Sequence, residues 1–282
     1  VLDRAHASGT SANAALLLRQ CFGFTSFRTG QEWAIQRCLD GKSSMLVMPT
    51  GAGKSLCYMI PAAAMPGLTI VVSPLISLMQ DQMKQLPPEL PGACFGGGMR
   101  ATDTALMVAS VLKGHLKVLF VSPERLCSYS FRNLMHKVRQ QYGSLTATST
   151  GSCLSPVALL CVDEAHCLSQ WSYNFRPAFL RMRREIALLR PQAILALTAT
   201  APPHVQRDVM QHLGVTAEEG LLSMPPKRPN LSYSATLVHS QQQRREALVR
   251  LMLGDKAVPG GASVASRSRG GTGGGRDGGS SW

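Results

Sequence analysis

The sequence contains few acidic residues and no long apolar run. Its 282 residues include 16 Asp and Glu against 29 Lys and Arg, which gives a formal net charge of +13. This excess favours a polyanionic partner, with nucleic acid as the first candidate, although a solvated basic surface would have the same composition. No apolar run approaches the roughly 20 residues that span a bilayer, and the N-terminus lacks the basic-then-apolar pattern of a signal peptide. We therefore expect a protein of the cytosol or nucleus.

The cysteines include no Cys-x-x-Cys pair, which disfavours a zinc site. Several of the eight lie inside apolar runs, so we expect buried thiols in a reducing compartment. With 45% apolar residues, the chain can bury one large α/β core or two small ones. The sequence opens at Val1 without an initiator Met, and we expect its start to be a fragment boundary.

Residues 48–55 read Met-Pro-Thr-Gly-Ala-Gly-Lys-Ser and follow the apolar run 45–47. A strand that leads into Gly-x-Gly-Lys-Ser and an apolar helix is typical of a phosphate loop, whose glycines let successive N–H groups turn inward around a polyphosphate. Lys54 can then reach the β- and γ-phosphates, and the Ser55 hydroxyl can ligate Mg²⁺. The general pattern has Gly where Met48 stands, so it is only partly met. The predicted nucleotide-binding residues of this loop are Thr50, Gly51, Ala52, Gly53, Lys54 and Ser55.

Three residues upstream of the loop could select the base of the nucleotide. The Phe24 ring can stack on a purine, and the amide of Gln31 can donate to N7 of adenine and accept from its N6 amine. Arg28 lies between them in the sequence. Such an arrangement would select ATP. A packed aromatic residue with two surface polar residues explains this stretch equally well.

Strand-like and helical segments alternate along the chain, which is typical of βαβ units. The sequence therefore predicts an α/β fold, with a mostly parallel sheet and helices on both faces. Strands are predicted at 45–47, 68–72, 93–95, 118–121, 157–162, 194–197 and 228–234. Helices are predicted at 12–21, 54–65, 75–86, 102–113, 129–142, 203–213 and 241–253. A further helix is predicted to follow residues 27–31 and to end at Leu39. The Ser-, Thr- and Gly-rich segment 143–156 is predicted to be a surface loop.

Two acids follow the fully apolar run 157–162, which is typical of a central strand buried on both faces. The carboxyl ends of parallel strands meet at one edge of the sheet, and that edge also carries the phosphate loop. Asp163 is therefore predicted to hold the Mg²⁺ ion that Ser55 ligates, and Glu164 to polarise the attacking water. Adjacent acids at a strand end are often only solvated, but the preceding phosphate loop favours the catalytic interpretation.

The segment 167–177 is rich in aromatic residues but has neither helical nor strand periodicity. Trp171, Tyr173 and Phe175 stand among polar residues directly after the acidic pair, which suits stacking on unpaired bases better than burial in a core. Arginines follow at 176, 181, 183, 184 and 190, against one acid, Glu185. They could contact phosphates, and a solvated basic helix face remains an alternative for the last four.

Six motifs occur in the order that one enzyme family shows. They are Phe-Gly-Phe with Phe-Arg-Thr-Gly-Gln (22–31), Pro-Thr-Gly-Ala-Gly-Lys-Ser (49–55), Ser-Pro-Leu-Ile-Ser-Leu-Met-Gln-Asp-Gln (73–82), Ser-Pro-Glu-Arg-Leu (122–126), Asp-Glu-Ala-His (163–166) and Ala-Leu-Thr-Ala-Thr-Ala (196–201). Over roughly residues 16–233 the chain resembles the first RecA-like lobe, a P-loop NTPase lobe, of superfamily 2 DNA helicases of the RecQ family. The residues at 48–55, 86–88 and 171–177 most resemble those of RecQ helicases of the Rothmund–Thomson syndrome type.

The resemblance implies ATP-driven unwinding of DNA with 3′ to 5′ polarity, in repair, recombination or replication, and a location in the nucleus. It implies catalytic roles for Lys54, Asp163, Glu164 and His166. Phe24, Arg28 and Gln31 would contact adenine, while Thr198 and Thr200, together with His166, would couple the nucleotide state to DNA. Trp171, Phe175 and Arg176 would form a sensor loop for single-stranded DNA, in which the family usually has His where Tyr173 stands.

The resemblance also implies a second lobe whose arginines complete the γ-phosphate site. Little of that lobe can follow residue 253, where the composition changes to Gly, Ser and Arg. We expect a flexible segment at 1–10, the ATP-binding lobe at 11–235, a linker helix or the start of a truncated second lobe at 236–255, and a disordered or artefactual tail at 256–282.

Loss of an arginine finger can cost about 10³ to 10⁵ in turnover, so we expect this chain alone to bind ATP weakly and hydrolyse it poorly. Two other interpretations remain. The first is a non-catalytic, ATP-gated module that binds nucleic acid. The second, a small-molecule kinase or NTPase, is disfavoured because nothing in the sequence resembles an acceptor site and the aromatic loop would have no role.

Overall fold

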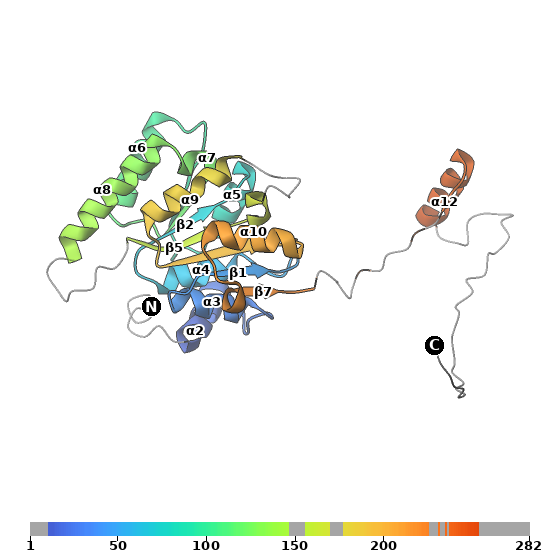
Figure 1. Ribbon diagram of the computed structural model, residues 1–282, viewed down its shortest axis with the longest axis horizontal. Helices are drawn as coiled ribbons and strands as arrows, with labels where there is room; N and C mark the ends of the chain where they lie inside the picture. Colours follow the sequence, from blue (N-terminus) through green and yellow to red (C-terminus); the bar gives the residue numbers. More distant parts are fainter. Residues whose placement is uncertain are drawn as a thin grey trace, which may run out of the picture. The chain divides into compact units, whose positions relative to one another are not determined.

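The computed structural model describes residues 11–146, 156–169, 177–225 and 237–253, together with 231 and 235. The chain divides into two compact units, 1–228 and 229–282 (Figure 1). The expected flexible start, the tail, the sensor loop 170–176 and, apart from Leu231, the predicted strand 228–234 lie outside the described residues. The first unit holds a single large sheet with its helices, and the second holds one described helix.

The first unit is built on a seven-stranded sheet whose order is β3-β4-β2-β5-β6-β1-β7. Every pair of neighbouring strands is parallel. The strands are β1 (Ser44–Val47), β2 (Leu68–Val72), β3 (Gly92–Phe95), β4 (Val118–Val121), β5 (Val157–Val162), β6 (Ala193–Thr198) and β7 (Leu221–Ser223). All residues of β1, β2, β4, β5 and β6 are buried, as near-continuous apolar strands in a parallel sheet should be. The predicted α/β fold is confirmed.

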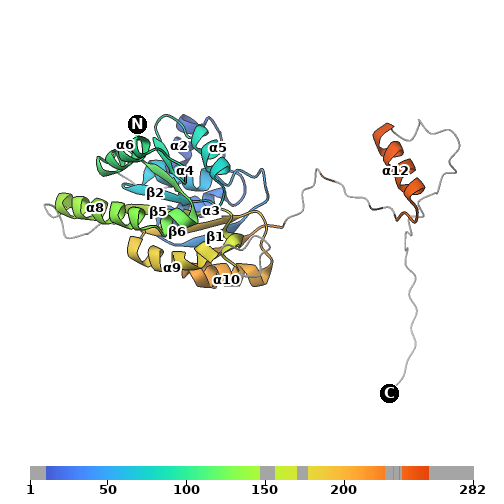
Figure 2. The ribbon, with the colours of Figure 1, turned by 90° about the horizontal axis from the view of Figure 1, so that it is seen from above.

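Helices cover both faces of this sheet, and the alternation of strand side chains divides the core accordingly. In β5, Leu160 and Val162 belong to one buried cluster, and Leu159 and Cys161 belong to the other. The first cluster packs against α6 (Ala101–Leu112), α7 (Pro123–Leu126), α8 (Tyr129–Thr146), α9 (Pro177–Leu189) and α10 (Pro203–Leu213). The second packs against α2 (Ser11–Phe22), α3 (Gln31–Leu39), α4 (Leu56–Ala64) and α5 (Ile76–Lys84). Figure 2 shows α9 and α10 on the opposite side of the strands from α2 and α5.

Local sequence explains where several of these helices begin and end. The Ser122 side chain accepts a hydrogen bond from the Arg125 N–H, and Pro123 takes the first turn of α7, where a missing N–H costs nothing. Gly214 ends α10 in the left-handed region at φ 66°. The predicted bounds of α10 are confirmed, whereas the short helix α7 was not predicted.

Strand β7 was not predicted. It pairs with β1 through Met45↔Leu221, Leu46↔Leu222 and Val47↔Ser223 and forms one edge of the sheet. Three residues are too few to show a strand periodicity, so only the pairing reveals this element. It follows the short helix α11 (Ala217–Gly220).

The second unit contains α12 (Gln241–Leu253), as the sequence predicts. Its apolar side chains, among them Leu248, Leu251 and Met252, are exposed within the described residues. None of the helices that the structure describes combines the length and the apolar character that crossing a bilayer requires. Seven cysteines are described, all without a disulfide; Cys38, Cys57, Cys161 and Cys167 are buried, and the other three are partly buried.

Candidate active site

The motif residues meet at the carboxyl edge of three adjacent strands, β5, β6 and β1. Val47 of β1 is in register with Thr198 of β6, and Val162 of β5 is in register with Ala196. The Met48 N–H donates to the Thr198 carbonyl at 3.0 Å, which extends the pairing past the end of β1. The phosphate loop, the acidic pair and the Thr198 segment therefore leave the sheet side by side.

The phosphate loop closes on itself in this structure. Gly51 and Gly53 have φ values of 82° and 84°, in the left-handed region that favours glycine. The Lys54 ammonium donates to the Met48 carbonyl at 3.3 Å. A phosphate group offers a stronger acceptor for this ammonium than a neutral carbonyl does, so the contact can be exchanged when a polyphosphate enters.

Arg28 and Gln31 brace the phosphate loop from α3 and the turn before it. The Gln31 amide nitrogen donates to the carbonyls of Ala52 (3.2 Å) and Gly53 (2.9 Å), and its oxygen accepts from the Arg28 N–H at 2.8 Å. The Arg28 guanidinium donates to the Gly51 carbonyl at 2.7 Å. Gln31 is 1% exposed, so in this closed loop its amide serves the protein backbone, and its contact with adenine stays a prediction.

Phe24 lies at the mouth of a hollow of about 520 Å³ next to the loop. Half of the Phe24 surface is exposed. Arg28, Gln31 and Ser55 line the same hollow, which brings the predicted base-binding residues to the predicted metal ligand. The hollow has the apolar lining with few polar groups that is usual for nucleotide pockets.

Asp163 is 4% exposed, and both of its carboxylate oxygens accept hydrogen bonds. Oδ1 accepts from the Glu164 N–H at 3.0 Å, and Oδ2 accepts from Nε2 of Gln82 at 2.8 Å. Burial raises the pKa of the Asp163 carboxyl, while the Gln82 hydrogen bond acts in the opposite direction. Sequence reasoning missed Gln82, although it ends the motif at 73–82. The available signal was its spacing of three residues from Met79, which places both on the buried face of α5.

Glu164 and His166 form an ion pair that reaches β6. The Nδ1 atom of His166 lies 3.2 Å from Oε2 of Glu164 and 2.9 Å from Oγ1 of Thr198. Because the Thr198 hydroxyl donates to the Thr200 carbonyl, its oxygen is the acceptor for His166. Contacts with Cys167 and Glu164 raise the pKa of His166 to about 9. The hydrogen bond from His166, and to a smaller extent the charge of Lys54, lower the pKa of Glu164.

A magnesium ion fits the donor set at this edge. Ser55 and Asp163 would supply a hydroxyl and a carboxylate to a bound ion, and these are the hard oxygen ligands that Mg²⁺ prefers. Within the described residues no group of three or more His, Cys, Asp or Glu could hold a metal ion. Most of the ligands would therefore come from nucleotide phosphates and water, as is usual for Mg²⁺ at phosphate loops.

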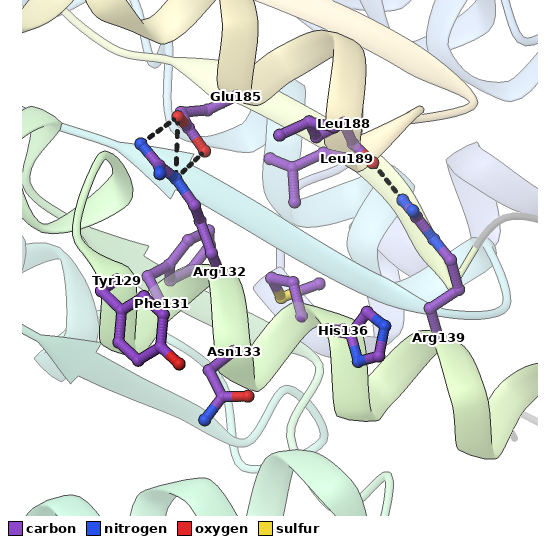
Figure 3. A pocket seen from close by; sticks show the side chains of 10 residues that line it. Tyr129, Phe131, Arg132, Asn133, His136, Arg139, Glu185, Leu188 and Leu189 are labelled. Carbon is purple, nitrogen blue, oxygen red and sulfur yellow. Dashed lines mark hydrogen bonds and ion pairs between the residues drawn. The ribbon is translucent and has the colours of Figure 1, made fainter.

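A second hollow, of about 310 Å³, lies between α8 and α9 and contains none of the predicted site residues (Figure 3). There the guanidinium of Arg132 binds the carboxylate of Glu185, with Nη2 2.7 Å from Oε1 and Nε 2.9 Å from Oε2. Arg139 donates to the Leu188 carbonyl. Glu185, the one acid of the arginine-rich segment, is 3% exposed, whereas Arg181, Arg183 and Arg184 are exposed. The predicted DNA-contact residues Trp171, Phe175 and Arg176 lie outside the described residues.

The sequence is similar to those of known helicases. The family model of the DEAD/DEAH box helicases matches residues 28–209. The chain is 43% identical over 239 residues to mouse (Mus musculus) "ATP-dependent DNA helicase Q4", covering 83% of this chain and 18% of that protein. It is 41% identical over 242 residues to "ATP-dependent DNA helicase Q-like 5" of Arabidopsis thaliana, covering 85% of this chain and 24% of that protein.

Solved structures agree on the fold. The structure of Mycobacterium smegmatis helicase Lhr bound to ssDNA and AMP-PNP matches with a TM-score of 0.53 at 21% identity, over 74% of this chain and 27% of that one. The chain spans only about a fifth of the length of the curated relatives named above. With the family model covering more than half of its residues and RecQ-type helicases as its relatives, this chain belongs to the DEAD/DEAH box helicase family and to its RecQ branch.

Proposed function

We propose that this chain is the ATP-binding lobe of a RecQ-type helicase that uses ATP and Mg²⁺ to unwind duplex DNA with 3′ to 5′ polarity. The observation that carries the proposal is the meeting of the phosphate loop, the Asp163–Glu164 pair and Thr198 at one edge of the sheet. The names of the relatives supply the reaction class.

The residues at this edge divide the work of phosphoryl transfer. Lys54 exchanges the Met48 carbonyl for the β- and γ-phosphates. Ser55 and Asp163 would hold Mg²⁺, which would neutralise part of the charge of these phosphates. Glu164, kept ionised by His166 and Lys54, orients the attacking water.

His166 links hydrolysis to DNA. Its hydrogen bond to Thr198 joins the acidic pair to β6, and Thr198 in turn holds the Thr200 carbonyl. A change in charge at the γ-phosphate position therefore alters the hydrogen bonds of the segment 198–200. We assign the reading of single-stranded DNA to Trp171, Phe175 and Arg176, and of adenine to Phe24, Arg28 and Gln31.

The activity belongs to a longer protein. A second lobe would supply arginines to the γ-phosphate, so the 282-residue chain alone binds ATP weakly and turns it over slowly. We place the ATP-binding lobe at 11–235 and a linker helix at 236–255. The parent works on DNA in the nucleus, in repair, recombination or replication.

The test is strand separation by the parent protein. Wild type unwinds a duplex with a 3′ overhang and not one with a 5′ overhang, and Lys54→Ala and Glu164→Gln abolish this activity. Lys42→Ala, which changes an exposed lysine before β1, keeps it. Unwinding that survives Lys54→Ala would refute the proposal.

The second candidate is an ATP-gated module that binds nucleic acid without hydrolysing ATP. It predicts nucleotide-dependent binding of single-stranded DNA by the 282-residue chain with no turnover in any longer form. A transcript that continues past residue 253 into a second α/β lobe would exclude it.

A further inference from the structure

The amide of Gln82 is a polar group buried in the candidate metal site. Gln82 is 8% exposed, and its Nε2 donates to Oδ2 of Asp163 at 2.8 Å, across 81 positions of sequence. Its Oε1 has no hydrogen-bond partner among the described residues. An unpaired buried amide oxygen costs free energy unless it serves a ligand.

The orientation of this amide follows from charge. An ionised carboxylate only accepts hydrogen bonds, so the NH₂ group of Gln82 must face Asp163. Oε1 is bonded to the same carbon as Nε2, so it belongs to the amide group that contacts Asp163 and is buried with it. A donor that binds Asp163, such as a water molecule of a hydrated cation, is the group that this oxygen can accept from.

Helix α5 holds Gln82 firmly in this position. Met79, one turn earlier, is fully buried against the sheet, while Leu75 and Ile76 at the start of the helix are 51% and 43% exposed. The N-terminal end of α5 therefore lies at the protein surface, and its C-terminal end contacts the Asp163 carboxylate through Gln82.

We propose that Gln82 is a positioning residue of the metal site, which orients the Asp163 carboxylate through Nε2 and accepts a hydrogen bond from a metal-bound water through Oε1. The inference rests on the proposed function, because it takes the nucleotide-bound Mg²⁺ as the cation. Groups that orient metal ligands in this way typically contribute about 10- to 100-fold to metal affinity.

The experiment uses the 282-residue chain and a fluorescent methylanthraniloyl derivative of ADP. The probe is bound first in EDTA and then titrated with Mg²⁺, and the Mg²⁺ concentration at half-maximal change is read. Gln82→Leu removes both polar atoms at similar volume, and Gln82→Asn keeps an amide that is too short to reach Asp163. Gln80→Leu, on the exposed face of the same helix, is the matched control.

Both Gln82 variants are expected to raise the Mg²⁺ midpoint by about 10- to 100-fold, with probe affinity in EDTA unchanged and with Gln80→Leu like wild type. A merely structural role would lower the melting temperature of the Gln82 variants and leave the Mg²⁺ midpoint where it is, which overturns the proposal. If wild type binds the probe with a clear Mg²⁺ midpoint and both variants have the same midpoint, the positioning role of Gln82 is refuted, and the proposed function is not. If wild type shows no Mg²⁺-dependent binding, the proposed function fails, and this inference fails with it.

Discussion

The Nδ1 atom of His166 lies 2.9 Å from the hydroxyl oxygen of Thr198 and 3.2 Å from the carboxylate of Glu164. One protonated nitrogen thus connects the acidic pair at the end of β5 with the end of β6. The charge on this imidazole has a consequence for stability that can be measured.

The pKa of His166 rises from its ordinary value of 6.5 to about 9 in the folded chain. Because the folded state binds the proton more tightly, the stabilisation is complete below pH 6.5 and is lost as pH rises through about 9. We expect the free energy of unfolding of wild type to fall, relative to that of His166→Gln, between these values in urea titrations. Parallel pH curves for the two proteins would contradict the ion pair.

Two glycines of the phosphate loop offer a matched pair. Both have φ values above 80°, but a Cβ on Gly53 would lie 2.6 Å from Nε2 of Gln31, whereas one on Gly51 would meet nothing within 4 Å. Gly51→Ala should cost about 1–2 kcal/mol from backbone strain, and Gly53→Ala should cost more because it also displaces the Gln31 amide. Equal urea midpoints for Gly51→Ala and Gly53→Ala would show that the Gln31 side chain can move aside without a cost in stability.

The Arg132–Glu185 pair should stabilise the contact between α8 and α9. Glu185 is almost fully buried, so Arg132→Ala leaves a carboxylate without its counter-charge, and we expect a lower urea midpoint. Replacing both residues, as Arg132→Met with Glu185→Leu, should recover most of that loss. Arg184→Ala, an exposed change on the same helix, serves as the control and should change little. A single variant that is no less stable than the double variant would refute this ordering.

Phe24 offers a test of base selection. Half of its surface is exposed, so its replacement should change nucleotide binding without a large change in the stability of the fold. Phe24→Ala should weaken binding of ATP by about 1–2 kcal/mol through loss of stacking, and reduce the preference for ATP over pyrimidine triphosphates. Tyr129→Ala removes an aromatic ring that is 81% exposed on α8 and should leave nucleotide binding intact. Isothermal titration of each nucleotide against both variants measures the difference. Equal losses in both would argue against a base site at Phe24.

The fold was largely predictable because its strands are apolar runs long enough to identify. The bounds of β4, β5, α10 and α12 are confirmed residue for residue. Strand β7 was missed because three residues carry no pattern of their own, and pairing with β1 alone makes them a strand.

Of the site, only the residues that belong to short sequence motifs could be predicted. Spacing along the chain placed Lys54 and Asp163 at strand ends on one edge, and parallel topology brings those ends together. The partner of Asp163, however, lies 81 positions earlier on α5, a contact that one sequence without its fold does not reveal. The hydrogen bonds from the Gln31 amide to the loop backbone were likewise not evident from the sequence, and its predicted contact with adenine stays a prediction.

Glu164 adopts the left-handed backbone conformation, with φ 49°, that residues with a Cβ usually avoid. Glycine or asparagine would sit there with less strain, yet neither carries a carboxylate that His166 and Lys54 can hold ionised. Selection for thermostability alone would therefore favour glycine or asparagine at 164, and the stabilised variants would lack the carboxylate that pairs with His166.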